Sequence, residues 1–246
     1  MNDSTLTRPA LVDPGDAADP GDAADSAGGG PRFTDEAWAA TAGLRAAIDA
    51  LPFLSELRDG TLPEATFRHY MTQDALYLAR YGRALAFAAA QSPSTDELVF
   101  FAERARDCIV VERELHAARI TDPDGAALSP TCAAYSSYLL SLAGEGCYPV
   151  LVAGVLPCFW IYDDVGTRLR ADVDDLGAHP FGDWIGTYGD PVFAEQTRQA
   201  RDIADAAARA ASPAVRARML EAFVAASRYE WMFWDAAYRL EGWPVG

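Results

Sequence analysis

Three side chains that could do chemistry stand in otherwise apolar, helix-patterned stretches of the sequence. Asp74, Cys158 and Glu230 each fall on the inward stripe of a different stretch, with apolar or aromatic neighbours at spacings of three and four residues. Burial shifts the pKa of a carboxyl group toward neutrality, which suits a proton donor or acceptor. A cysteine can act as a nucleophile. This set of residue types is typical of covalent catalysis assisted by proton transfer.

Each of the three residues also has a purely structural interpretation. Asp74 could pair with an arginine in the core, and Glu230 could pair with Arg83 or Arg228, because buried charges need partners. Cys158 could be a small buried hydrophobic residue, the common state of a free cysteine. Spacing alone cannot show that the three side chains converge.

Pro157 directly precedes Cys158 within the stretch LVAGVLPCFWIYDDVG. A proline inside a helix lacks an N–H and costs roughly 3 kcal/mol. Here it leaves the carbonyl of Ala153 without its helical partner and predicts a bend. We expect that bend to turn the thiol toward a ligand and away from packed neighbours.

The elements that must position these residues read as helices from Phe33 onward, because no long stretch alternates with a period of two. Start signals include Thr34, Pro63, Ser94 and Ser129. The sequence therefore predicts an all-α, single-domain helical bundle over residues 33–246. The expected helices cover about 34–50, 63–91, 95–120, 130–145, 147–170, 181–188 with 190–211, and 213–240.

Composition limits the classes of partner. Residues 1–32 include a tandem PGDAAD repeat that cannot supply a hydrophobic face, which predicts a disordered acidic tail. The formal net charge of −16 argues against nucleic acid and anionic membranes. We expect no apolar run to reach the ~20 residues of a membrane span, and the N-terminus lacks a secretory pattern. We expect a cytoplasmic protein that binds a small ligand or another protein.

Metal sites have weak support in the sequence. The four cysteines form no CxxC pair, and there are only three histidines. One alternative is a di-iron protein with Glu112 and His116, spaced by four, joined by Asp74 and Glu230. We expect neither a metal nor a cofactor.

Five segments resemble, in order and spacing, the signature segments of the thiaminase II (TenA) family in its cysteine-containing class. The resemblance covers about residues 35–243 and implies a haem oxygenase-like fold. The segments are ELRDGTLPEATFRHYMTQDALYL, SPTCAAYSSYLL, LPCFWIYDDVG, WIGTYGD and RYEWMFWDAAY.

The resemblance implies roles for individual residues. Cys158 matches the catalytic nucleophile, Glu230 the acid/base, and Asp74 the carboxylate that holds the ring nitrogen and exocyclic amine of a pyrimidine. Tyr135 is also expected to hold the sulfur. The positions expected to line or close the pocket are Tyr77, Tyr135, Tyr162, Tyr188 and Phe233.

The activity implied is that of an aminopyrimidine aminohydrolase of thiamin salvage. Its substrate would be 4-amino-5-aminomethyl-2-methylpyrimidine, with thiamin as a side substrate whose thiazole leaves, and the enzyme would be a homotetramer. A pyrimidine-binding regulatory protein without turnover is an alternative. Loss of activity on replacing Cys158 by serine would separate the two.

Overall fold

The computed structural model describes residues 31–119 and 127–245, and for residues 111–119 it describes the backbone alone. In these ranges the chain forms ten helices and no strand, so the all-α prediction is confirmed. The helices are α1 (Phe33–Ala40), α2 (Ala42–Asp49), α3 (Pro52–Arg58), α4 (Glu64–Gln91), α5 (Thr95–Arg119), α6 (Pro130–Gly144), α7 (Tyr148–Asp172), α8 (Gly182–Tyr188), α9 (Pro191–Ala210) and α10 (Pro213–Tyr238). Residues 1–30 of the predicted tail lie outside the described residues.

Capping side chains explain several helix starts. The hydroxyl of Ser129 accepts from the backbone N–H of Cys132 at the start of α6, and Ser212 does the same for Val215 at the start of α10. The predicted cap Thr34 is wrong, because Thr34 lies inside α1 and its hydroxyl donates to Asp205. Prolines occupy the first turns of α3, α6, α7, α9 and α10, where a missing N–H costs nothing.

The N-terminal region differs from the prediction. The single helix expected over 34–50 is two helices separated at Thr41, whose hydroxyl donates to the carbonyls of Ala37 and Trp38 and so competes with the helical ladder. The short helix α3 was not predicted. Helix α4 begins at Glu64, one residue after the predicted start at Pro63, and Pro63 is its N-cap residue.

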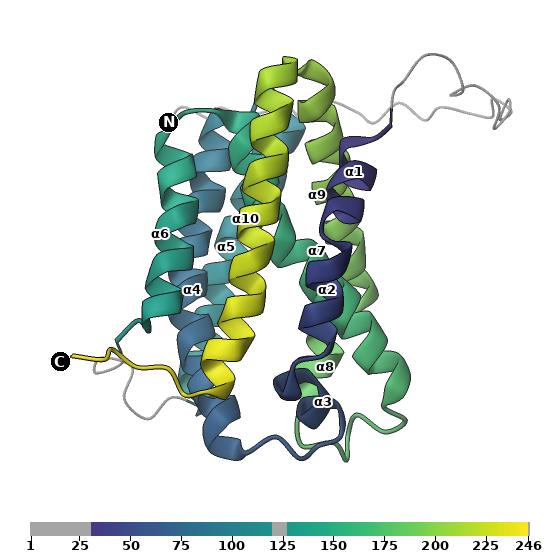
Figure 1. Ribbon diagram of the computed structural model, residues 1–246, viewed down its shortest axis with the longest axis vertical. Helices are drawn as coiled ribbons and strands as arrows, with labels where there is room; N and C mark the ends of the chain where they lie inside the picture. The colour runs from purple at the N-terminus through teal and green to yellow at the C-terminus, as the bar shows by residue number, and fades with distance from the viewer. Residues whose placement is uncertain (1–30, 120–126, 246) are drawn as a thin grey trace, which may run out of the picture. The chain divides into compact units, whose positions relative to one another are not determined.

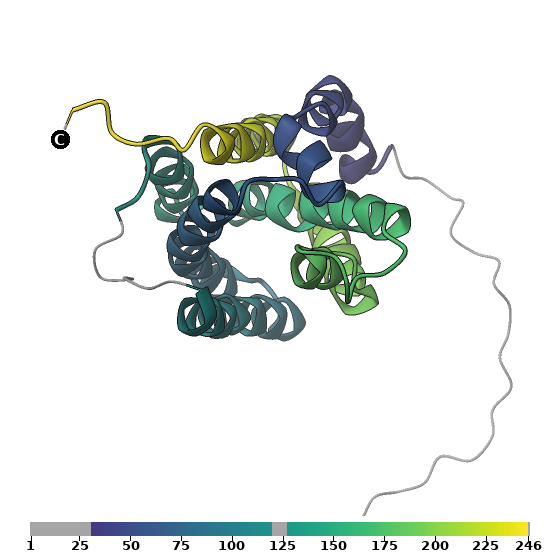
Figure 2. The ribbon, with the colours of Figure 1, turned by 90° about the horizontal axis from the view of Figure 1, so that it is seen from below.

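The long helices surround α7. In the end-on view of Figure 2, α4, α5 and α6 lie on one side, α8 and α9 lie on the other, and α7 runs between them. Helix α10 packs along α7, with α1, α2 and α3 beside it (Figure 1). Cys158, Asp74, Glu230 and Tyr135 are therefore carried by α7, α4, α10 and α6, which all contact one another.

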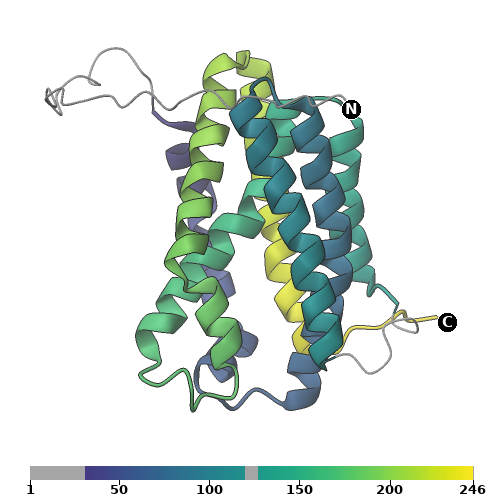
Figure 3. The same cartoon turned by 180° about the vertical axis from the view of Figure 1, so that it is seen from behind.

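Helix α7 contains Pro157 in its interior. Seen from behind, the C-terminal part of α7 slants away from α4 and α5 toward α9 (Figure 3). Among the described residues it is the one helix long and apolar enough to cross a membrane by length and composition, contrary to the expectation from its sequence. Most of its apolar stretch is buried against other helices, as in the core helix of a bundle.

Candidate active site

Cys158 lies deep in the bundle, directly after the interior proline of α7. Burial raises the pKa of its thiol well above the ordinary value, and the nearby charge of Glu230 raises it further. Part of the residue nevertheless remains accessible to water, so packing does not seal it on all sides. Burial therefore favours the protonated thiol, and the residue is not fully enclosed.

A hydroxyl group supports the backbone of α7 just before the proline. Tyr81 of α4 donates a 2.8 Å hydrogen bond to the carbonyl oxygen of Val155. The two residues are buried, and the bond ties α4 to the turn that carries Cys158. This contact helps to fix where the sulfur lies relative to α4.

The two buried carboxyl groups lack the arginine partners that a structural role would require. Asp74 and Glu230 are 3 % and 2 % exposed, and neither forms an ion pair among the described residues. The guanidinium of Arg83 donates to the carbonyl of Ala79, and Arg228 is exposed. The ion-pair interpretation is therefore wrong within this part of the chain.

Burial makes both carboxyl groups proton carriers near neutral pH. It raises the pKa of Asp74 to about 7, and one oxygen of this group, Oδ2, is buried without a hydrogen-bond partner. It raises the pKa of Glu230 to about 8, with a smaller contribution from the charge of Asp74. An unpartnered buried oxygen is costly, which favours a ligand as its partner.

Tyr135 is paired with Glu230. Its hydroxyl donates a 2.6 Å hydrogen bond to Oε1 of Glu230, which opposes the rise in the pKa of that carboxyl. The expected contact of Tyr135 with the sulfur of Cys158 is not the hydrogen bond that the structure shows, because the hydroxyl donates to the carboxyl group of Glu230 instead. Tyr77 is better placed than Tyr135 to hold the sulfur. Its buried hydroxyl has no well-formed hydrogen bond but lies close enough to Cys158 to lower the pKa of the thiol.

The aromatic residues predicted as site walls form two groups of contacting rings. The ring of Phe233 lies 5.7 Å from that of Tyr77, which in turn lies 4.9 Å from Tyr135. The rings of Tyr162 and Tyr188 lie 4.8 Å apart, and Tyr188 is partly accessible to water. Like Cys158, it lies deep in the bundle but is not fully enclosed.

Tyr188 comes close because α7 has a glycine opposite it. A Cβ atom on Gly166 would lie 2.5 Å from the backbone carbonyl carbon and oxygen of Tyr188. No side chain fits at that separation, so Gly166 allows the end of α8 to rest directly on α7. The WIGTYGD segment is positioned by this approach.

Two residues near the site were not singled out from the sequence. Tyr70 is fully buried, and its hydroxyl forms hydrogen bonds with the hydroxyl of Tyr162 and the indole N–H of Trp184. Tyr70 stands on the same stripe as Asp74, four residues before it, which is the signal that could have identified it. Trp184 had no such signal, because its position depends on how α8 folds back onto α7.

The di-iron alternative concerns residues that are only partly described. The side chains of Glu112 and His116 lie outside the described residues. Among the side chains that are described, no group of three His, Cys, Asp or Glu is placed to hold a metal ion.

The helical bundle places the chain in the class of proteins with the haem oxygenase-like fold. A Shewanella denitrificans domain of unknown function with that fold matches with a TM-score of 0.62 and 13 % identity, over 85 % of this chain and 92 % of the other. Within that class, residues 46–240 match the TENA/THI-4/PQQC family, and the chain belongs to it.

Relatives within the family agree with this assignment. The chain is 33 % identical over 219 residues to an aminopyrimidine aminohydrolase of Bacillus subtilis, covering 86 % of this chain and 92 % of the relative. It is 36 % identical over 213 residues to the thiamine biosynthesis multifunctional protein ThiED of Corynebacterium glutamicum, covering 87 % of this chain. The match spans only 28 % of that longer protein. A TenA homologue from P. horikoshii OT3 superposes with a TM-score of 0.75 at 25 % identity, covering 85 % of this chain and 99 % of the other.

Proposed function

We propose that the protein is an aminopyrimidine aminohydrolase that converts 4-amino-5-aminomethyl-2-methylpyrimidine and water into the 5-hydroxymethyl pyrimidine and ammonia. The observation that carries the proposal is that the partly accessible residue Cys158 lies close enough to the carboxyl group of Glu230 for that charge to raise the pKa of the thiol, while burial raises the pKa of Glu230 itself to about 8. The family relationship and the name of the Bacillus relative support the same activity.

In the proposed first step, the sulfur of Cys158 forms a bond to a ring carbon of the pyrimidine. The ring nitrogen gains a proton from Glu230, while the proton of the thiol returns to the carboxyl, so the adduct is neutral overall. The high pKa of the thiol suits this order, because the proton leaves the sulfur only as the new bond forms. Tyr135 holds the carboxyl in place through its 2.6 Å hydrogen bond.

In the second step, the amine leaves with a proton as ammonia, and the adduct gains an exocyclic double bond. Water adds to the methylene carbon, the carbon–sulfur bond breaks, and the aromatic ring and the thiol are restored. Asp74 is proposed to hold the ring nitrogen and amino group of the substrate, which would provide a partner for its buried Oδ2. The same route with thiamin would release the thiazole as the leaving group.

The test compares three substrates with wild type and a Cys158→Ser variant. Aminomethylpyrimidine, its formyl derivative and thiamin are assayed in parallel for the hydroxymethyl product. We expect the aminomethyl compound to have the highest kcat/KM and the variant to lose nearly all activity on each. Mass spectrometry under denaturing conditions should detect a pyrimidine adduct on the wild-type chain alone.

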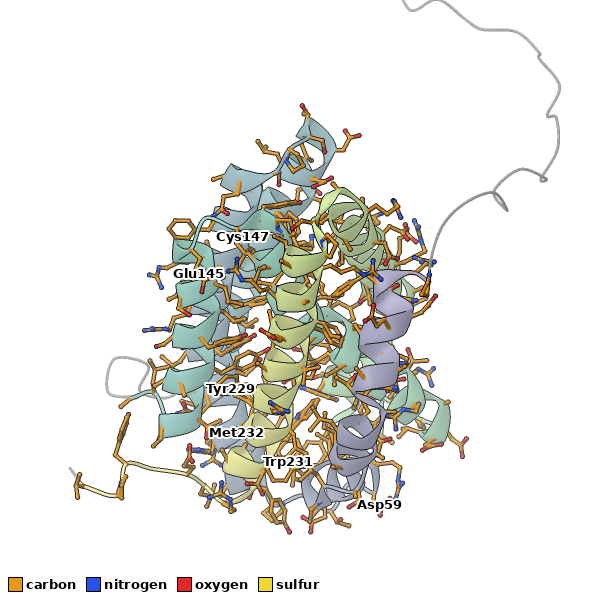
Figure 4. The ribbon with its side chains drawn as sticks, turned by 45° about the horizontal axis from the view of Figure 1, so that its top comes forward. Asp59, Glu145, Cys147, Tyr229, Trp231 and Met232 are labelled. Atoms are coloured by element: carbon orange, nitrogen blue, oxygen red, sulfur yellow. The ribbon has the colours of Figure 1, made fainter. Side chains whose placement is uncertain are left out.

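The matched control is Cys147→Ser. Cys147 is the N-cap residue of the same helix, about three turns before Cys158, and Figure 4 shows it well apart from Tyr229, the neighbour of Glu230 in the sequence. Its replacement should leave kcat/KM unchanged. Undiminished turnover in the Cys158→Ser variant would contradict the covalent mechanism, and pyrimidine binding without turnover in wild type would favour a regulatory binding protein.

The assembly and location form part of the same proposal. We infer a cytoplasmic homotetramer, with contacts through apolar side chains that α4 and α5 leave exposed. These residues are Phe87, Leu98, Val99 and Ile109. Sedimentation of the wild-type protein and of a Leu98→Asp, Ile109→Asp variant tests it, and an unchanged monomer in both samples would contradict it.

A further inference from the structure

A chain of hydrogen bonds connects three aromatic residues behind the proposed site. The indole nitrogen Nε1 of Trp184 donates to the hydroxyl of Tyr70 at 3.2 Å, and that hydroxyl donates to the hydroxyl of Tyr162 at 3.2 Å. The chain joins α8, α4 and α7. All three residues are buried, and Tyr70 has no exposed surface.

The chain has a fixed direction because its first member can only donate. An indole N–H has no acceptor lone pair, so the Tyr70 oxygen must accept from Trp184. Tyr70 has one proton, and the hydroxyl of Tyr162 is its one hydrogen-bond acceptor among the described residues. If Tyr162 donated to Tyr70, the Tyr70 proton would have no partner in a fully enclosed position, which is unfavourable.

This direction leaves the proton of Tyr162 without an acceptor in the described part of the chain. Tyr162 lies one helical turn after Cys158 on α7, so the two side chains share a face of that helix. Tyr70 lies one turn before Asp74 on α4, and its ring lies 5.9 Å from that of Phe233. The Tyr162 end of the hydrogen-bond chain is therefore among the proposed substrate-binding residues.

We propose that Trp184 and Tyr70 are positioning residues that orient the Tyr162 hydroxyl to donate its proton to a nitrogen of the bound pyrimidine. The inference rests on the proposed function, since it requires a pyrimidine in the site. Packing supports the arrangement: the Tyr70 ring contacts Phe53 at 5.1 Å and Trp184 at 6.2 Å, which fixes the ring that carries the central hydroxyl.

The first experiment is a double-mutant cycle in kcat/KM. Tyr162→Phe should lower kcat/KM about tenfold, and Tyr70→Phe about three- to tenfold, the range of a single hydrogen bond. In the Tyr162→Phe background, adding Tyr70→Phe should leave kcat/KM unchanged, because the Tyr162 proton that Tyr70 orients is already absent. A residue that only supports the fold would show its full loss in both backgrounds, and that result would overturn the proposal.

The second experiment needs no substrate. In a ¹H–¹⁵N spectrum, the indole resonance of Trp184, assigned with a Trp184→Phe variant, should shift and exchange faster with solvent in Tyr70→Phe. The control is Tyr238→Phe, which removes a hydroxyl that donates to Glu56 near the end of α10. It should move neither this resonance nor kcat/KM. An unchanged Trp184 resonance in Tyr70→Phe would show that the hydrogen bond from Trp184 to Tyr70 does not exist, and would overturn the proposal.

The two readouts separate failure of the inference from failure of the proposed function. If wild type turns over no aminopyrimidine, the proposed function fails, and the same cycle is run on the affinity for the hydroxymethyl pyrimidine by calorimetry. Non-additive losses in affinity would still support the positioning role. Additive losses, or no binding of that pyrimidine, would overturn it.

Discussion

The hydroxyl of Tyr135 and the carboxyl of Glu230 form a 2.6 Å hydrogen bond between two buried side chains of α6 and α10. The hydroxyl donates, so it stabilises the ionised carboxylate and opposes the effect of burial on its pKa. The Tyr135 ring also stacks on the ring of Tyr229 at 5.2 Å with an interplanar angle of 9°. Tyr229 lies on the side of α10 next to α6 (Figure 4). Burial therefore raises the pKa of Glu230, and the hydroxyl of Tyr135, whose ring is stacked on Tyr229, limits that rise.

Replacing Tyr135 with phenylalanine should move the pH profile toward higher pH. Without the donor, the ionised form of Glu230 loses stabilisation and the pKa of the carboxyl rises above about 8. The proposed acid must be protonated, so the basic limb of kcat/KM against pH should shift upward while the maximal rate falls. The measurement is kcat/KM between pH 6 and pH 10 with the aminomethyl substrate.

Tyr138→Phe is the control for that prediction. Tyr138 lies one turn further along α6, and its ring contacts Tyr229 without any hydrogen bond to Glu230. Its pH profile should match that of wild type. A basic limb that moves to lower pH in Tyr135→Phe would contradict the assignment of Glu230 as the acid.

The free energy of unfolding should fall as the pH rises from about 4 to about 8. Folding raises the pKa of Glu230 from 4.5 to about 8 and that of Asp74 from 3.8 to about 7, so in this window the folded chain binds more protons than the unfolded chain. Stability from these groups is complete below the unfolded values and is lost as pH rises through the folded values. Urea unfolding at pH 5 and pH 8 should differ by at least about 1.4 kcal/mol, the value of one pKa unit.

An Asp74→Asn, Glu230→Gln double variant should remove most of this pH dependence, because neither amide titrates. A variant with two exposed carboxyl groups neutralised, Glu195→Gln and Asp202→Asn, is the control for the change in net charge. If the Asp74→Asn, Glu230→Gln variant kept the wild-type change in the free energy of unfolding with pH, the two buried carboxyl groups would not be the source of that change.

Much of the architecture could be predicted because it depends on local pattern. The helical stripes place Asp74, Cys158 and Glu230 inward, and the resemblance identifies the segments that carry them. The break at Thr41 was missed because a continuous apolar stripe does not show that a hydroxyl takes helical carbonyls. The unpaired state of the carboxyl groups was also hidden, since spacing cannot show whether an arginine reaches the core.

Partnerships between helices were the least predictable part of the site. The sequence indicates that Tyr135 points inward, but whether its hydroxyl meets Cys158 or Glu230 depends on how α6 sits against α7 and α10. The link from Trp184 to Tyr70 joins residues 114 positions apart. Such contacts arise from packing between distant segments, which local periodicity does not encode.

Gly166→Ala should weaken substrate binding by displacing Tyr188. The added Cβ would lie 2.5 Å from the backbone of Tyr188, so the end of α8 must move away from α7. We expect KM to increase several-fold and the free energy of unfolding to fall by about 1–3 kcal/mol, the usual cost of overpacking. Gly43→Ala is the control, because no atom lies within 4 Å of its added Cβ. That variant should keep its KM and gain up to about 1 kcal/mol of stability.

Pro157→Ala should have opposite effects on stability and activity. Alanine supplies the N–H that the carbonyl of Ala153 lacks, so α7 should straighten and the free energy of unfolding should rise by up to about 3 kcal/mol. Straightening turns Cys158 away from the substrate, and a displacement of about 1 Å can lower kcat about a hundredfold. Pro149→Ala, in the first turn of the same helix where no N–H is needed, should change neither quantity. Denaturant unfolding and kcat measured on the three proteins test this, and a Pro157→Ala protein that is more stable and equally active would show that the bend does not direct the sulfur.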